Sequence, residues 1–176
     1  MRQLFYNAKI LSSPSETPFD GELIIENGHI TRVLSRGAVK EGDFDRKIDC
    51  GQNLLMSGFC NAHTHAAMCL FRGAADDLPL EEWLYDRIFP MEDKLTPEDI
   101  YWGAMLQICE FVRSGITCFA DMYFCLDAVY EAAKNANLCV ALCGGENSFS
   151  KADAFRNIQA SYEKYSTISV SYTHLR

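Results

Sequence analysis

The sequence predicts an α/β fold that follows a smaller all-β segment. Residues 4–52 consist of short β-rich runs separated by loops rich in Ser, Pro, Gly and Asp, a pattern typical of strands joined by turns. From residue 53 the order becomes apolar strand, loop and amphipathic helix, repeated, as in parallel sheets. The chain is 48% hydrophobic and 23% charged, which is the composition of a folded globular protein. We therefore predict two segments, residues 1–52 and 53–168.

The all-β segment is predicted to contain three β-rich stretches. These are LFYNAKILS, GELIIENGHITRVLS and DRKIDCG. In the middle stretch Asn27 and Gly28 separate two β-rich runs. This dipeptide tolerates the positive φ angles that a type I′ turn requires at both central positions. We therefore predict a hairpin over residues 22–34.

The α/β segment is predicted to contain three strand–helix units. The strands are expected in NLLMSGFCN, ITCFADM and LCVALCG. The first long helix has Thr96 as its expected N-cap, Pro97 as its first residue and Gly115 at its end. Its buried face is expected to contain Ile100, Ala104, Ile108 and Phe111. A second helix is expected to be capped by Asp127, and a third to open with Ser150.

Charge and composition exclude several classes of function. The 16 Lys and Arg against 24 Asp and Glu give a formal net charge of −8, so a nucleic-acid backbone is not an expected partner. No apolar run approaches the ~18 residues of a membrane span, and the amino terminus lacks the apolar centre of a signal peptide. The eight cysteines have irregular spacings and lie mostly in apolar runs, which favours reduced thiols. We therefore expect a cytoplasmic protein that contacts neither nucleic acid nor membrane.

The stretch LLMSGFCNAHTHAAM contains the chemically most informative residues. His63 and His65 lie two residues apart at the end of an apolar strand. Side chains at this spacing point to the same side of a strand, so both imidazoles can bind one metal ion. An HxH pair taken alone is also compatible with a histidine that caps the strand or is hydrogen-bonded in the core, and without its surroundings this structural alternative is the more common one. The two histidines therefore predict half of a metal site, with that structural alternative open.

The segment SGFCNAHTH resembles the PGFxNxHxH signature of the amidohydrolase superfamily, with Ser57 in place of the proline. Downstream, residues 63–124 resemble the branch of 5-methylthioadenosine/S-adenosylhomocysteine deaminases and their guanine-deaminase and chlorohydrolase relatives. The resemblance implies a (β/α)8 TIM barrel preceded by part of a small β-sandwich. Such a barrel needs about 250 residues, so this chain is expected to contain only its first three to four units. An open half-barrel exposes sheet edges and apolar helix faces, so aggregation or assembly of the isolated chain is expected, and a homo-oligomer is one form that assembly can take.

The resemblance also implies a metal-dependent aminohydrolase. His63 and His65 match the first two ligands of a divalent metal, Zn²⁺ or another ion such as Fe²⁺. Neutral imidazoles suit zinc, and the metal lowers the pKa of a bound water to about 7. The implied reaction is hydrolysis of the exocyclic amine of a purine nucleoside or related heterocycle. A small molecule is therefore the expected partner.

Glu92, in FPMEDKL, matches the family position whose carboxylate accepts hydrogen bonds from the ribose hydroxyls. A carboxylate can accept both hydrogen bonds of a vicinal diol. The alternative is that Glu92 belongs to an exposed acidic pair with Asp93. We predict the substrate-binding role.

The family takes its remaining ligands and its acid–base groups from later strands, so no catalytic residue is expected within this chain. Two alternatives remain open for its function. One is a non-catalytic, incomplete fragment. The other is a relative that acts on C–Cl bonds or on cyclic amide or amidine bonds, of the chlorohydrolase or guanine-deaminase type. Residues 169–176 depart from the family pattern and are predicted to be a non-native tail, which excludes His174 as a ligand.

Overall fold

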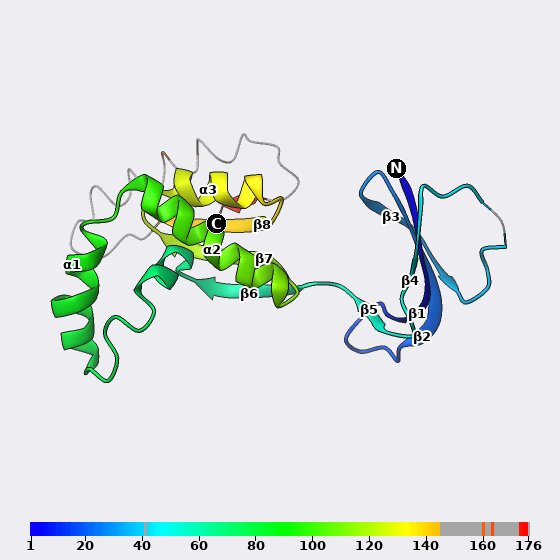
Figure 1. Cartoon of the computed structure of the whole chain (residues 1–176), viewed down its shortest axis with the longest axis horizontal. Coiled ribbons are helices and arrows are strands. Elements are labelled where there is room, and N and C mark those ends of the chain that lie inside the picture. Colours follow the sequence, from blue (N-terminus) through cyan, green and yellow to red (C-terminus); the bar gives the residue numbers. More distant parts are fainter. Residues whose placement is uncertain (41, 145–159, 161–162, 164–172, 176) are drawn as a thin grey trace. The chain divides into compact units, whose positions relative to one another are not determined.

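The computed structural model describes residues 1–40, 42–144, 160, 163 and 173–175. The chain forms two compact units, Met1–Ser57 and Gly58–Arg176, and each is described by itself (Figure 1). No helix in the described part of the chain is long and apolar enough to cross a membrane. All eight cysteines are free thiols in this structure.

The first unit is a five-stranded sheet centred on its first strand. The strand order is β3-β2-β1-β4, and β5 also pairs with β1. Strand β1 is antiparallel to β2 and parallel to β4 and β5. The strands are β1 (Arg2–Leu11), β2 (Phe19–Glu26), β3 (His29–Ser35), β4 (Arg46–Asp49) and β5 (Leu54–Met56).

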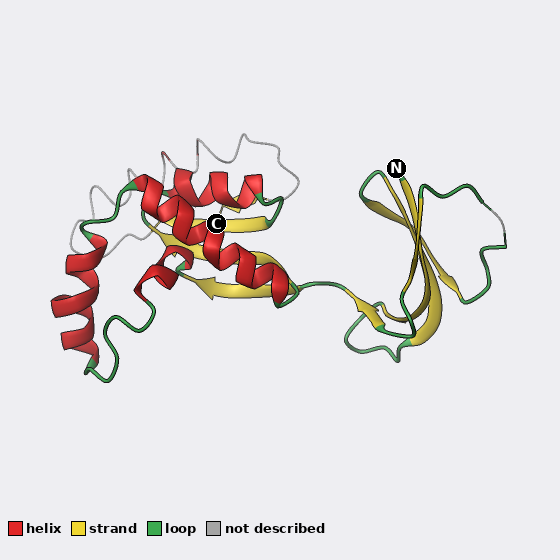
Figure 2. Cartoon of the chain, viewed as in Figure 1, coloured by secondary structure: helices red, strands yellow, loops and turns green. Residues whose placement is uncertain are grey.

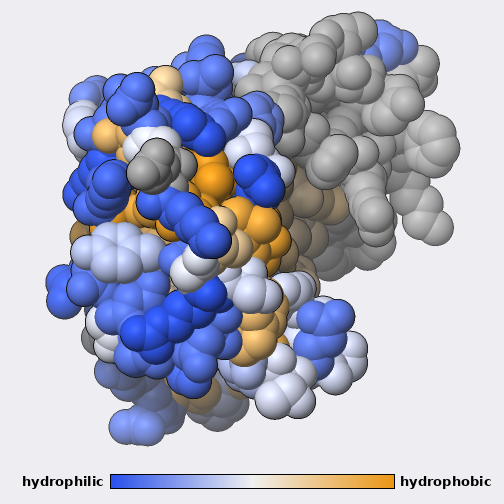
Figure 3. Space-filling model, turned by 90° about the vertical axis from the view of Figure 1, so that its right-hand side faces the viewer, coloured by the Kyte–Doolittle hydropathy of each residue, from blue (hydrophilic) through white to orange (hydrophobic). Residues whose placement is uncertain are grey.

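The predicted hairpin is confirmed between β2 and β3. Asn27 and Gly28 have φ angles of 52° and 83°, and Glu26 pairs with His29 across the turn. A small apolar core of Ala8, Ile10 and Leu23 lies on the sheet. Apolar residues also reach the surface of this unit between hydrophilic ones (Figure 3).

The second unit is a parallel sheet with helices packed on it (Figure 2). The strand order is β6-β7-β8-β9, and every neighbouring pair is parallel. The strands are β6 (Phe59–Thr64), β7 (Ile116–Tyr123), β8 (Cys139–Gly144) and β9 (Thr173–Leu175). The helical elements are η1 (Ala66–Phe71), η2 (Glu82–Ile88), α1 (Phe89–Glu92), α2 (Pro97–Arg113) and α3 (Leu126–Asn135). Element η2 is a π-helix that continues into α1.

Helix α2 begins and packs as its sequence predicts. The Thr96 hydroxyl accepts a hydrogen bond from the Asp99 N–H at 3.2 Å, and the Asp99 carboxylate accepts one from the Thr96 N–H at 2.9 Å. This reciprocal pair is a capping box. The predicted face, Ile100, Ala104, Ile108 and Phe111, is buried. It packs in one core with Phe119 of β7 and Val129 of α3, which fixes β7 against the helices.

Replacing Thr96 with alanine is expected to lower the free energy of unfolding by about 1 kcal/mol, the usual contribution of an N-cap hydroxyl. Hydrogen bonds from Thr96 lower the pKa of Asp99. An aspartate whose pKa is lower in the folded state stabilises the fold at pH values above its unfolded-state pKa of about 3.9. This stabilisation is lost as the pH falls through the pKa of the folded state. The effect of the substitution is therefore expected to shrink below about pH 4.

Urea unfolding of the 176-residue chain at pH 7 and at acid pH measures both effects. Thr96→Ser keeps the hydroxyl and is the matched control. A Thr96→Ala variant as stable as Thr96→Ser at pH 7 would exclude the capping role.

Two predicted elements are wrong in detail. The stretch 53–61 is two strands: β5 pairs with β1 of the first unit, and β6 pairs with β7 of the second. Between them Gly58 lies so close to Thr117 that a Cβ would collide with its side chain, so the chain passes from one sheet to the other at a position that requires glycine. Asp127 does not cap α3, because Cys125, with a φ of 49°, is the N-cap. Asp127 lies instead in the first turn, where its charge suits the helix dipole.

Two further predictions lie largely outside the described residues. The third helix is expected to open with Ser150. Of its residues the structure describes only Ala160 and Glu163, and both are helical. Of the tail predicted to be non-native, the structure describes Thr173–Leu175, which pairs with β8.

Candidate metal centre

The two predicted metal ligands lie together at the carboxyl end of β6. The rings of His63 and His65 have centroids 5.2 Å apart and are inclined at 81°. His63 is exposed and His65 is half-buried, whereas Thr64 between them is buried. The alternation of a strand therefore places both imidazoles on the side opposite to the Thr64 side chain.

A backbone carbonyl of the next strand fixes the orientation of His65. Its Nδ1 lies 2.6 Å from the carbonyl oxygen of Met122 in β7. Because a carbonyl only accepts, Nδ1 carries the proton and donates it. In the neutral ring Nε2 is then left with a lone pair. This is the hydrogen-bonding arrangement that metal-ligating histidines usually have.

The spacing of the two rings fits a shared metal ion. With Zn–N bonds of about 2.0–2.1 Å and tetrahedral angles, two ligating imidazoles have centroids about 5 Å apart. The observed 5.2 Å agrees with this distance. Within the described ranges no third His, Cys, Asp or Glu completes a metal-binding group. The pair thus fits as two of the three protein ligands of a catalytic zinc site.

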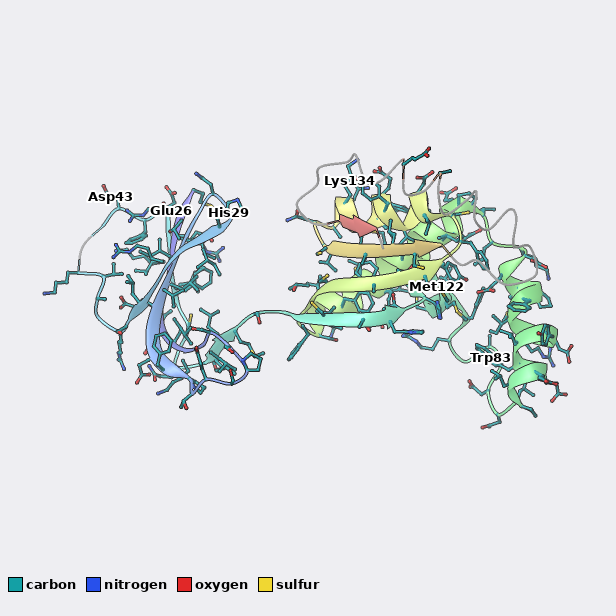
Figure 4. All side chains as sticks on the ribbon, turned by 180° about the vertical axis from the view of Figure 1, so that it is seen from behind. Glu26, His29, Asp43, Trp83, Met122 and Lys134 are labelled. Atoms are coloured by element: carbon teal, nitrogen blue, oxygen red, sulfur yellow. The ribbon has the colours of Figure 1, made fainter. Side chains whose placement is uncertain are left out.

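A cavity of about 280 Å³ brings His65 and Glu92 together. Most of its lining is apolar or aromatic and comes from η2, α1 and the end of β7. Trp83 and Met122, labelled in Figure 4, are two of its lining residues. His63 does not line this cavity, so the structure joins Glu92 to only one of the two predicted ligands.

Glu92 has neighbours that act on its pKa in opposite directions. Burial raises the pKa of this carboxyl most strongly, while the Tyr123 hydroxyl and the His65 ring lower it. Burial and the nearby Glu92 carboxylate in turn raise the pKa of Tyr123. A half-buried carboxylate beside a phenol and an imidazole is suited to bind donor groups of a ligand. Glu92 is therefore not part of an exposed acidic pair.

Two further polar residues, His29 and Arg72, are not among the residues that line this cavity. His29 begins β3 of the first unit and is exposed. Arg72, in the long loop after β6, donates two hydrogen bonds to Glu110 of α2, at 2.8 and 2.9 Å. Sequence reasoning missed Tyr123 and the Met122 carbonyl. Their one sequence signal is their place at a strand end, where barrel enzymes collect functional groups.

The sequence of this chain is similar to a known protein family and to named relatives. The model of the Amidohydrolase family matches residues 54–170, more than half of the chain. A 5-methylthioadenosine/S-adenosylhomocysteine deaminase of Syntrophomonas wolfei subsp. wolfei is 50% identical over 147 residues, which cover 82% of this chain and 34% of that protein. The chain thus spans about a third of the length of this relative.

Solved structures show the same fold. A zinc-bound adenosine deaminase from Xanthomonas campestris superposes with a TM-score of 0.84 at 27% identity, covering 98% of this chain and 41% of that chain. An atrazine chlorohydrolase from Arthrobacter aurescens TC1, complexed with zinc, has a TM-score of 0.81 at 17% identity. The match covers 98% of this chain and 45% of the chlorohydrolase chain. That likeness shows the fold alone. The second unit is accordingly the first part of a TIM barrel. Its matched residues show that the chain belongs to the amidohydrolase family.

Proposed function

We propose that this chain is the amino-terminal part of a metal-dependent aminohydrolase that removes the exocyclic amine of a purine nucleoside or related heterocycle. The observation that carries the proposal is the shared cavity of His65 and Glu92. It combines an imidazole with a free Nε2 and a carboxylate suited to hydroxyl donors. A 5-methylthioadenosine/S-adenosylhomocysteine deaminase at 50% identity supports the same substrate class.

In this proposal His63 and His65 hold a divalent metal, Zn²⁺ or alternatively Fe²⁺. The bound metal supplies a water whose pKa is lowered to about 7, and hence a hydroxide at neutral pH. The carbonyl of Met122 keeps the proton of His65 on Nδ1. Metal ligation then needs no change of tautomer.

Glu92 orients the substrate in this proposal. Its carboxylate accepts hydrogen bonds from two vicinal hydroxyls of a ribose. The apolar and aromatic walls, among them Trp83 and Phe89, bind the flat heterocycle and exclude water from it. A substrate with both parts uses the whole cavity, whereas a triazine or a free base leaves Glu92 without its diol.

The compartment and partners are proposed on the same chemistry. The net charge of −8 supports a small-molecule substrate and no nucleic-acid partner. Eight free thiols support the reducing cytoplasm. Homo-oligomerisation is also proposed, because exposed apolar side chains such as Phe59 and Leu106 are available for contacts.

Ammonia release by the full-length protein that contains this segment tests the proposal. We expect turnover of 5-methylthioadenosine or S-adenosylhomocysteine, its loss with a chelator and its return with Zn²⁺. Guanine and a chlorotriazine are the competing substrates. Turnover of those two alone would favour the guanine-deaminase or chlorohydrolase type, and no turnover together with no bound metal would contradict the proposal. The same assay on the 176-residue chain tests the alternative of a non-catalytic fragment, which predicts no turnover by that chain.

A further inference from the structure

The end of β7 holds the segment that contains His65. Asp121 of β7 is 1% exposed, and its Oδ1 accepts two hydrogen bonds. One comes from the Thr64 hydroxyl at 2.5 Å and the other from the Ala66 backbone N–H at 2.7 Å. The residues directly before and after His65 are thus bound to the same carboxylate oxygen.

The next residue of β7 contacts His65 itself. The Met122 carbonyl accepts the hydrogen bond from Nδ1 of the ring at 2.6 Å. Three groups are therefore hydrogen-bonded to two consecutive residues of β7: the Thr64 hydroxyl, the Ala66 backbone N–H and the ring of His65. Rotation of the ring, or a shift of residues 64–66 along β7, would break at least one of these bonds.

The two donors that bind Asp121 have few alternative acceptors. Thr64 and Ala66 are both buried, so the Ala66 N–H has no direct access to bulk water. The Thr64 hydroxyl has one other acceptor, the Ala120 carbonyl at 3.1 Å. Loss of the Asp121 side chain would accordingly release the segment chiefly at Ala66 and, through it, at His65.

We propose that Asp121 is a positioning residue of the metal centre, which raises the affinity for a divalent metal by holding His65 in place without touching the metal. The proposal rests on the proposed function in one respect, that His65 ligates a metal. Hydrogen-bonding partners that orient metal ligands typically contribute about 10–100-fold to metal affinity. The same factor is expected here.

The conservative substitution Asp121→Asn tests whether the hydrogen bonds of Asp121, and not its volume or its charge, determine the metal affinity. Both hydrogen bonds end on Oδ1, whereas Oδ2 has no hydrogen-bond partner among the described residues. Asp121→Asn keeps a carbonyl oxygen as acceptor for both donors. Asp121→Ala removes the acceptor altogether.

The test is zinc affinity of the full-length protein that contains this segment, measured by competition with a chromophoric chelator. Asp121→Ala is expected to weaken zinc binding by about 10–100-fold, and Asp121→Asn to stay within about threefold of the unmodified protein. Val140→Ala truncates another buried side chain of the same core and is expected to leave zinc affinity unchanged. Each value is taken per folded molecule, with the folded fraction measured by urea unfolding.

A second substitution keeps the test decisive if Asp121→Ala does not fold. Thr64→Val removes one of the two donors and leaves the Ala66 bond, and it is expected to weaken zinc binding severalfold, whereas Thr64→Ser is not. Equal zinc affinity of Asp121→Ala and the unmodified protein overturns the inference, as does an Asp121→Asn variant as weak as Asp121→Ala. Either result leaves the proposed function standing. Absence of zinc from the unmodified protein would instead overturn the proposed function as well.

Discussion

In the full-length protein, His65→Ala is expected to lose the bound metal and to lower kcat/KM for ammonia release by at least about 10³-fold. The ring of His65 is placed by the Met122 carbonyl with Nε2 free, and its centroid lies 5.2 Å from that of His63. Removing one of the two proposed ligands in this chain weakens binding of the metal and removes the source of hydroxide at neutral pH. His63→Ala is expected to have the same effect.

Metal content by mass spectrometry and initial rates of ammonia release measure this effect. His29→Ala is the matched control, because His29 is an exposed histidine of the first unit and its loss is expected to change neither quantity. A His65→Ala variant that retains stoichiometric metal and activity would show that the HxH pair has only a structural role in the strand.

Glu92→Gln is expected to lower kcat/KM for ribonucleosides by about 10–100-fold, chiefly through KM, because hydrogen bonds to a charged group contribute about 1.5–3 kcal/mol each. The amide keeps the shape of the side chain but replaces one acceptor oxygen with a donor nitrogen. A 2′-deoxyribonucleoside makes one hydrogen bond fewer and is expected to lose less. The preference for ribose over deoxyribose should therefore shrink in the variant.

Steady-state kinetics with adenosine, 2′-deoxyadenosine and 5-methylthioadenosine measure this preference. Asp93→Asn is the matched control, since Asp93 is the adjacent acid but is exposed and does not line the cavity. If Asp93→Asn impaired turnover as much as Glu92→Gln, the effect would come from the charge of the segment. A Glu92→Gln variant with the KM of the unmodified protein would remove the proposed contact with the diol.

Elements whose causes are local could be predicted from the sequence. The turn at Asn27 and Gly28 depends on the φ angles of those two residues alone. The start of α2 depends on Thr96 and Asp99, three residues apart. The placement of His63 and His65 on one side of a strand follows from strand geometry. In each case the signal and the structure lie within a few residues.

Features that depend on residues distant in the sequence were predicted wrongly or were not predicted. Residues 54–56 look continuous with the strand that follows, yet they pair with β1, some 45 residues earlier in the sequence. Only the choice of pairing partner separates β5 from β6, and an apolar run does not encode that choice. The Met122 carbonyl has no side-chain signature, because every residue carries such a group. The contacts of Asp121 are a further case, because its donors Thr64 and Ala66 lie more than fifty residues away in the chain.

Anomalous diffraction at the zinc absorption edge, from crystals of the full-length protein, tests the central claim most directly. The claim is that His63 and His65 are two ligands of one metal ion beside the cavity that contains Glu92. We expect an anomalous peak about 2.0–2.1 Å from a ring nitrogen of each histidine, with Nε2 as the ligating atom of His65. A metal bound elsewhere in the protein, with no peak between these two rings, would contradict the account.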